Sequence, residues 1–234
     1  MTEKSKIAFT NYSGGKDSHF AIIKAIELGY NLKLLFTFNA GKLHHEIFNE
    51  FPKSDIIKKQ ANLMGIRCYE YKYNKMEIPF LDAIRKSVKI IGHEEKTIFI
   101  SSMDYDLTKQ DRKITNNIIS GIRKMGIKYI SVVKGNDMFD IIEKTLSKGI
   151  RYIITAVEKN VSYNWLGKVI DEGFIRYLKD EKRKGNTITA NDFQTLVTES
   201  PIMKKRLLIK SSEIVDGFQR TTSILLKIKK YRFV

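Results

Sequence analysis

A short polar, glycine-rich loop near the start of the chain has the residue types that could hold phosphate groups. It lies between an apolar run and a segment of helical periodicity, and it reads Ser13-Gly14-Gly15-Lys16-Asp17-Ser18. Two glycines let the backbone turn tightly and approach a phosphate with no Cβ in the way. The N–H groups of the first helical turn, with the helix dipole behind them, point at an anion there. We therefore predict a phosphate-binding loop that opens a helix.

The side chains of this loop suit a nucleotide triphosphate. Lys16 adds a full positive charge, and the hydroxyls of Ser13 and Ser18 can donate further hydrogen bonds. Asp17 could hold magnesium or serve as the acidic residue of the first helical turn. We expect all six loop residues to bind phosphate groups, with Asp17 as the candidate metal ligand.

Other chemistries find less support. The P-loop NTPase pattern needs four residues between its glycines, and the dinucleotide pattern needs three glycines, so neither fits the loop. The single cysteine, Cys68, excludes an internal disulfide and a four-cysteine zinc site. No Ser/His/Asp arrangement is evident.

The elements that must position the loop alternate regularly as far as residue 157. Apolar runs that predict strands cover 7–10, 31–38, 67–71, 97–101, 129–133 and 151–157, and helical periodicity covers 17–28, 55–64, 79–91, 111–124 and 138–147. Such alternation is typical of a doubly wound, mostly parallel α/β sheet.

Beyond Val157 the pattern changes. One or two helices are predicted within 165–178, a charged stretch at 179–186 interrupts them, and β-elements are predicted at 192–197, 205–209 and 223–234. We therefore expect an ATP-binding α/β domain at 1–157 and a smaller α+β substrate-recognition subdomain at 158–234.

The loop resembles the SGGxDS loop of the PP-loop, or N-type ATP pyrophosphatase, superfamily. Three later segments are similar to motifs of its diphthine–ammonia ligase (diphthamide synthase) family. Gln60–Ile66 resembles "QAxxxGI", Trp165–Lys168 resembles "LG(K/R)", and Asp192–Ile202 resembles "EFHTLVxDxPxF". The matches run in order from Phe9 to about Ile209.

This resemblance implies an adenine-nucleotide alpha-hydrolase-like fold and an enzyme that uses ATP and Mg²⁺. Members of the family adenylate the carboxylate of diphthine, a modified histidine of translation elongation factor 2. Ammonia then displaces AMP to give diphthamide, and pyrophosphate is released as well. By the resemblance, the six loop residues would bind ATP, and Asp192 and Gln194 would join Lys16 and Asp17 in catalysis.

Further residues are candidates for the two substrates. Phe36 and Thr37 end the second predicted strand, where adenine commonly lies in open α/β sheets. His44, His45, Glu158 and Thr195 are candidates for the acceptor side: the histidines by the resemblance, and Glu158 because it ends a predicted strand.

The chain departs from the family in the segment 188–195, where the family has Gly-Glu-Asn-Gly-Glu-(Phe/Tyr)-His-Thr. Thr189 replaces a glutamate, and Asp192 keeps a carboxylate on a shorter side chain. Gln194 replaces the histidine, so it can hydrogen-bond but cannot transfer a proton at neutral pH. Two alternatives follow: a PP-loop enzyme with another acceptor such as tRNA, or a protein that binds ATP without turning it over.

The balance of 42 Lys+Arg against 26 Asp+Glu gives a formal charge of +16. This excess favours anionic partners. The basic residues are dispersed along the sequence, so nucleic acid is a possible partner but not the favoured one. No apolar stretch is long enough to span a membrane, and the first residues do not resemble a signal peptide, so we expect a cytoplasmic protein.

Overall fold

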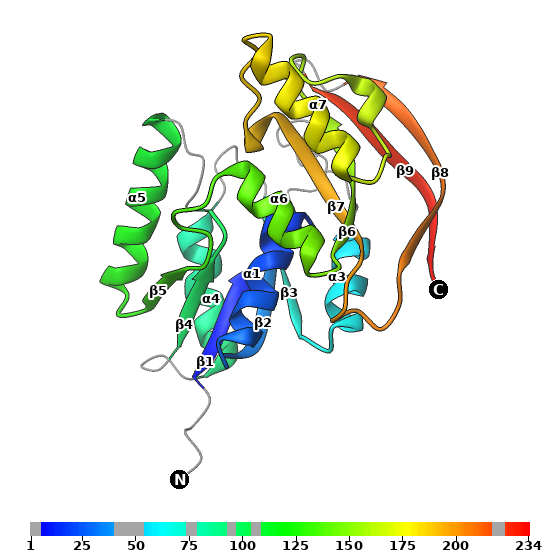
Figure 1. The fold of residues 1–234 in the computed structure, drawn as a ribbon. Helices are drawn as coiled ribbons and strands as arrows, with labels where there is room; N and C mark the ends of the chain where they lie inside the picture. Colours follow the sequence, from blue (N-terminus) through cyan, green and yellow to red (C-terminus); the bar gives the residue numbers. More distant parts are fainter. Residues whose placement is uncertain (1–5, 40–53, 74–78, 93–96, 104–108, 217–222) are drawn as a thin grey trace.

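The computed structural model of the protein describes residues 6–39, 54–73, 79–92, 97–103, 109–216 and 223–234. These residues form two β-sheets with helices packed around them (Figure 1). The first sheet is parallel and belongs to the N-terminal part of the chain. The second is antiparallel and is formed by the C-terminal part.

The parallel sheet has the strand order β3-β2-β1-β4-β5. Its strands are β1 (Ile7–Asn11), β2 (Asn31–Asn39), β3 (Cys68–Lys72), β4 (Ile98–Ser101) and β5 (Lys128–Ser131). Every neighbouring pair is parallel. The central strands are apolar runs because helices cover both faces of such a sheet.

Helices lie on both faces of this sheet. They are α1 (Lys16–Glu27), α3 (Ser54–Leu63), α4 (Phe80–Ile91), α5 (Lys109–Lys124) and α6 (Met138–Ser147). Apolar residues of α1 and α3 pack around Tyr12 and Leu35, whereas those of α4 and α5 pack around Phe36 and Phe99. Neighbouring residues of one strand point to opposite faces, so the two helix pairs cover opposite faces. The predicted doubly wound α/β sheet is confirmed.

The second sheet has the order β7-β6-β9-β8, and its strands are antiparallel. They are β6 (Arg151–Val157), β7 (Phe193–Glu199), β8 (Leu207–Asp216) and β9 (Ile224–Phe233). The helix α7 (Glu172–Arg183) packs on it through Phe174, whose ring centroid lies 5.2 Å from that of Phe193.

Two expectations were wrong. We expected 151–157 to continue the parallel alternation, but β6 is an inner strand of the antiparallel sheet. An apolar run shows that a strand is covered on both sides and does not show which sheet it joins. The stretch at 179–186 was expected to interrupt the helices, yet α7 continues to Arg183, with exposed pairs such as Arg183–Asp180 along its last turns. The division of the chain after residue 157 stays a prediction.

Within the described ranges, no helix combines the length and the apolar character needed to cross a lipid bilayer.

Candidate nucleotide-binding site

The predicted phosphate loop lies at the switch point of the parallel sheet. It follows β1, which pairs with β2 on one side and β4 on the other, and it leads directly into α1 (Figure 1). Open α/β sheets bind their ligands at the carboxyl ends of the strands at this point. Gly14 has a φ of 81°, in the left-handed region that glycine adopts without strain. The sequence prediction and the topology therefore indicate the same place.

The two serine hydroxyls close the loop on itself. The Oγ atoms of Ser13 and Ser18 are 3.1 Å apart, and the amide of Ser13 donates to Ser18 Oγ at 3.2 Å. Ser18 Oγ also donates to the carbonyl of Gly15 at 3.2 Å. These bonds fix the turn that brings the chain into α1.

Lys16 and Asp17 form an ion pair at the beginning of α1. Lys16 Nζ lies 2.9 Å from each carboxylate oxygen of Asp17. The Lys16 side chain is 1% exposed and that of Asp17 is 31% exposed. Lys16 Nζ also lies 5.4 Å from the ring centroid of Phe193, at cation–π distance. One buried positive charge is therefore held beside the loop, next to a carboxylate that reaches solvent.

Strand β7 of the second sheet contacts this loop directly. The amide of Lys16 donates to Thr195 Oγ1 at 3.0 Å, and the amide of Val197 donates to the carbonyl of Gly14 at 2.9 Å. A Cβ placed on Gly15 would lie 3.1 Å from the carbonyl oxygen of Thr195. Thr195, an acceptor-site candidate from the sequence, thus touches the phosphate loop.

A buried hydrogen-bond network lies beneath the loop. Gln60, fully buried on α3, donates through Nε2 to the carbonyl of Val197 at 2.6 Å. Its Oε1 accepts from the hydroxyl of Tyr12 at 3.1 Å, and that hydroxyl lies 3.2 Å from Nδ1 of His19. The Tyr12 hydroxyl donates its proton to Gln60 Oε1, so Nδ1 of His19 is the donor to the Tyr12 oxygen. The network joins the residue that follows β1 to α1, α3 and β7.

His19 is neutral in the folded protein. Its side chain is fully buried on α1, and burial lowers its pKa to about 3. Burial also raises the pKa of the Tyr12 hydroxyl well above its usual range. Nε2 of His19 has no hydrogen-bond partner within the described residues, as suits an unprotonated ring nitrogen. Protonating this ring would place an unpaired charge inside the protein.

The His19→Gln protein should lose less stability in mild acid than the parent. An unfolded histidine has a pKa of about 6.5, so between about pH 6.5 and pH 3 the unfolded state binds one more proton than the folded state. The free energy of unfolding then falls with decreasing pH by up to about 1.4 kcal/mol per pH unit. Glutamine can still donate to Tyr12 but does not titrate.

Urea unfolding of both proteins at about pH 7 and about pH 5 measures this difference, above the range in which carboxylates titrate. The parent should lose at least about 1 kcal/mol more than the variant over this interval. An identical loss in the two proteins would show that His19 takes up a proton as readily in the folded protein as in the unfolded chain, which would contradict its lowered pKa.

Asp192, Gln194 and Glu158 lie together near the start of β7. The carboxylate of Asp192 accepts from Thr189 Oγ1 at 2.9 Å and caps a short 3-10 helix at Ala190–Asp192. The amide of Glu158 donates to the carbonyl of Asp192 at 2.8 Å, and its carboxylate accepts from the hydroxyl of Ser223. The Gln194 side chain is exposed. Their roles in the reaction stay predictions.

The other candidate residues are placed differently. Phe36 is fully buried and packs against Phe80, with ring centroids 5.6 Å apart, so its side chain is part of the core. Thr37 is also buried. A role of either residue at adenine is still untested, and His44 and His45 lie outside the described residues.

Within the described residues, a magnesium site would need oxygen ligands from the phosphates of a bound substrate in addition to protein side chains. This part has no cluster of three or more metal-binding side chains. Mg²⁺ commonly binds through one or two carboxylates together with phosphates of the substrate. The partly exposed carboxylate of Asp17 fits that mode.

Sequence reasoning did not assign Gln60, Tyr12, His19 or Phe193 to the site. Gln60 was noted only within the resemblance, although a fully buried amide on an amphipathic helix needs a specific partner. Its partner is the carbonyl of Val197, far along the chain, and no local pattern could reveal that contact.

The fold is a doubly wound α/β sheet with a glycine-rich loop at its switch point, which is the architecture that the sequence resemblance implies. Residues 137–234 match the family model described as "Diphthamide synthase C-terminal domain". The match confirms the predicted resemblance over this part of the chain, and it supports an ATP-using enzyme.

One similar solved structure is that of a predicted subunit of tRNA methyltransferase from Methanocaldococcus jannaschii. The TM-score is 0.44 and the identity 18%, and the similarity covers 83% of this chain and 98% of that chain. Values this low support no conclusion about function. A search of curated proteins finds no match.

Proposed function

We propose that the protein is an ATP-dependent ligase that adenylates the carboxylate of diphthine on translation elongation factor 2. Ammonia then displaces AMP, forming the amide of diphthamide. One observation carries this proposal: a glycine loop with a buried lysine opens α1 at the switch point and is contacted by β7, a strand within the diphthamide synthase C-terminal domain match.

The loop residues would act by electrostatic stabilisation. Attack of a carboxylate on the α-phosphorus of ATP leaves pyrophosphate, so negative charge must be offset on both sides of the breaking bond. The backbone of Gly14 and Gly15 lets phosphates approach the N-terminus of α1, and Lys16 supplies a full charge. A bound phosphate would replace Asp17 as the ion-pair partner of Lys16. The Asp17 carboxylate would then be available to bind Mg²⁺.

Thr195 and Gln60 would keep the loop in its binding shape. Thr195 accepts from the Lys16 amide, and Gln60 holds the carbonyl of Val197, whose own amide holds Gly14. A loop already fixed by such bonds needs little reorganisation when charge develops.

The segment before β7 would face the acceptor. Asp192 or Glu158 could accept a proton from ammonium, whereas Gln194 could only orient the nucleophile. The candidates His44 and His45 belong to the same proposed side of the site.

The test is to incubate the protein with ATP, Mg²⁺, ammonium and diphthine-bearing elongation factor 2. We expect AMP, pyrophosphate and an elongation factor whose mass shows conversion of the carboxylate to an amide. Without ammonium, ATP cleavage should still depend on the elongation factor, but no amide should form. Absence of both AMP and amide would refute the proposal.

Two alternatives rest on the altered segment, in which Thr189 and Gln194 replace a glutamate and a histidine of the family pattern. If the true acceptor is another molecule such as tRNA, AMP should form when that molecule is present and should not form with elongation factor 2. A protein that binds ATP without turnover would release no pyrophosphate above background with either one.

A further inference from the structure

A group of basic side chains gathers at one end of the β8–β9 hairpin. We call it the hairpin patch, and all its members are exposed: Lys204, Lys205, Arg206, Lys210, Lys230 and Arg232. The segments 200–212 and 224–234, which supply it, contain no aspartate or glutamate. The patch is therefore positively charged throughout.

Strand pairing brings these residues together. Arg206 and Val234 exchange two backbone hydrogen bonds at 3.0 Å, Arg232 lies opposite Leu208, and Lys230 lies opposite Ser211. The alternate residues of β9, Tyr231 and Phe233, pack on the core of the second sheet. Because successive side chains of a strand alternate, Lys230 and Arg232 point to the outer face. Figure 1 shows this end of the hairpin at the chain's C-terminus, at the outer edge of the second sheet.

Acidic side chains near the patch have other partners. The carboxylate of Asp55 accepts from the hydroxyl of Tyr231. Glu213, the nearest carboxylate on β8, is bound by Lys227 at 3.2 Å and Lys229 at 2.6 Å. No ion pair within the described ranges includes any of the six patch residues. On α7, by contrast, Lys184 and Arg183 each pair with an acidic residue of the same helix. Like charges on neighbouring strands repel, and a bound anion relieves this repulsion.

We propose that the hairpin patch binds the sugar–phosphate backbone of single-stranded RNA. Residues i and i+2 of a strand lie about 7 Å apart on one face, so the charges of Lys230 and Arg232 lie side by side along β9 at about this spacing. A chain with a charge on every nucleotide can follow such a row, whereas carboxylates on a folded protein are not spaced in this way. Arg206 and Arg232 add guanidinium groups, whose planar donors match phosphate oxygens.

The net charge of the chain supports the same partner. A formal charge of +16 attracts polyanions over a distance and raises their rate of encounter. The sequence alone did not favour nucleic acid because the cations seemed dispersed, but the fold concentrates six of them on β8, on β9 and in the turn before β8. The patch lies on β8, on β9 and in the turn before β8, whereas β7 contacts the nucleotide loop, so the proposal does not depend on the proposed function.

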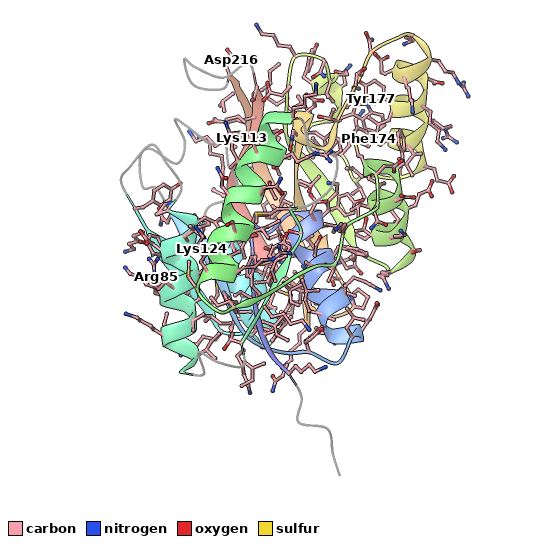
Figure 2. All side chains as sticks on the ribbon, turned by 90° about the vertical axis from the view of Figure 1, so that its left-hand side faces the viewer. Arg85, Lys113, Lys124, Phe174, Tyr177 and Asp216 are labelled. Carbon is pink, nitrogen blue, oxygen red and sulfur yellow. The ribbon has the colours of Figure 1, made fainter. Side chains whose placement is uncertain are left out.

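The experiment measures binding of a short fluorescein-labelled oligouridylate by anisotropy across a salt series. The patch variant is Arg206→Gln/Lys230→Gln/Arg232→Gln. The matched control, Lys113→Gln/Arg123→Gln/Lys124→Gln, removes the same charge from exposed positions of α5 (Figure 2 shows Lys113 and Lys124 on this helix). The parent should bind with a steep negative dependence of log affinity on log salt.

We expect the patch variant to reduce that slope by about 2, since each lost phosphate contact on a single strand contributes about 0.7. The α5 control should change it by less than about half as much. A second variant, Lys204→Gln/Lys205→Gln, lies in a turn outside the strand pairing and should reduce the slope by about 1. An unchanged urea midpoint in each variant confirms that the fold is retained.

Three results would overturn the proposal. The patch and control variants could weaken binding equally, which would show that RNA is bound by the general positive charge of the protein and not by the hairpin patch. Polyglutamate could bind as tightly as oligouridylate, which would indicate an acidic protein partner. The parent could also fail to bind RNA at low salt.

Discussion

The Lys16→Met protein should lose AMP formation almost entirely, with kcat/KM reduced by about 10²–10³-fold. Lys16 is the buried cation beside the phosphate loop, and its Nζ lies 2.9 Å from both oxygens of Asp17. Methionine fills a similar volume but cannot offset the charge that develops on the leaving pyrophosphate. Asp17 keeps contact with solvent at 31% exposure, so its carboxylate can stay hydrated in the variant.

Initial rates of AMP and pyrophosphate release measure this effect, and nucleotide affinity is measured separately by titration calorimetry. Lys89→Met is the matched control, since Lys89 is an exposed residue near the end of α4 and should leave both values unchanged. If folded Lys16→Met protein released AMP at the parental rate, the loop would not be the catalytic phosphate site.

The second large effect is expected from Gly14→Ala. Gly14 has a φ of 81°, and a side chain in this region costs about 1–2 kcal/mol. An added Cβ would also lie 3.0 Å from Gln60 Oε1 and 3.3 Å from Ile57 Cγ1. The free energy of unfolding should therefore fall by about 2–3 kcal/mol in total, and ATP affinity should fall at least about tenfold because the loop must shift.

Gly65→Ala separates the two causes. Gly65 has a similar φ of 72°, but a Cβ there would meet nothing within 4 Å. This variant should show the conformational cost alone, with normal ATP affinity. Urea unfolding and calorimetry of both variants give the comparison. Equal losses of stability and of affinity in the two variants would show that the contact with Gln60 is unimportant.

Much of the parallel sheet could be predicted from the sequence because its elements are locally encoded. Apolar runs of four to nine residues end at glycine or polar turns, and the helices between them carry clear amphipathic periodicity. The candidate phosphate loop could be proposed for a related reason: its residue types, their spacing and the strand–turn–helix context lie within one short segment.

The second sheet and the supports of the site could not be predicted in the same way. The membership of β6 depends on pairing with β7 and β9, which follow it by tens of residues. The contacts of Gly14 with Val197 and of Lys16 with Thr195 also join distant segments. Such contacts follow from tertiary packing, and no periodicity in one sequence reports them.

The hydrogen bonds between β7 and the glycine loop affect how the protein unfolds. Val197 uses its amide on Gly14 and its carbonyl on Gln60, so the edge of the C-terminal sheet is closed by the N-terminal half. Separating the two halves would leave these backbone groups without hydrogen-bond partners. It would disrupt the glycine loop at the same time. The two sheets should therefore melt as one cooperative unit, and a fragment that ends before β7 would lack the hydrogen bonds that β7 makes with the glycine loop.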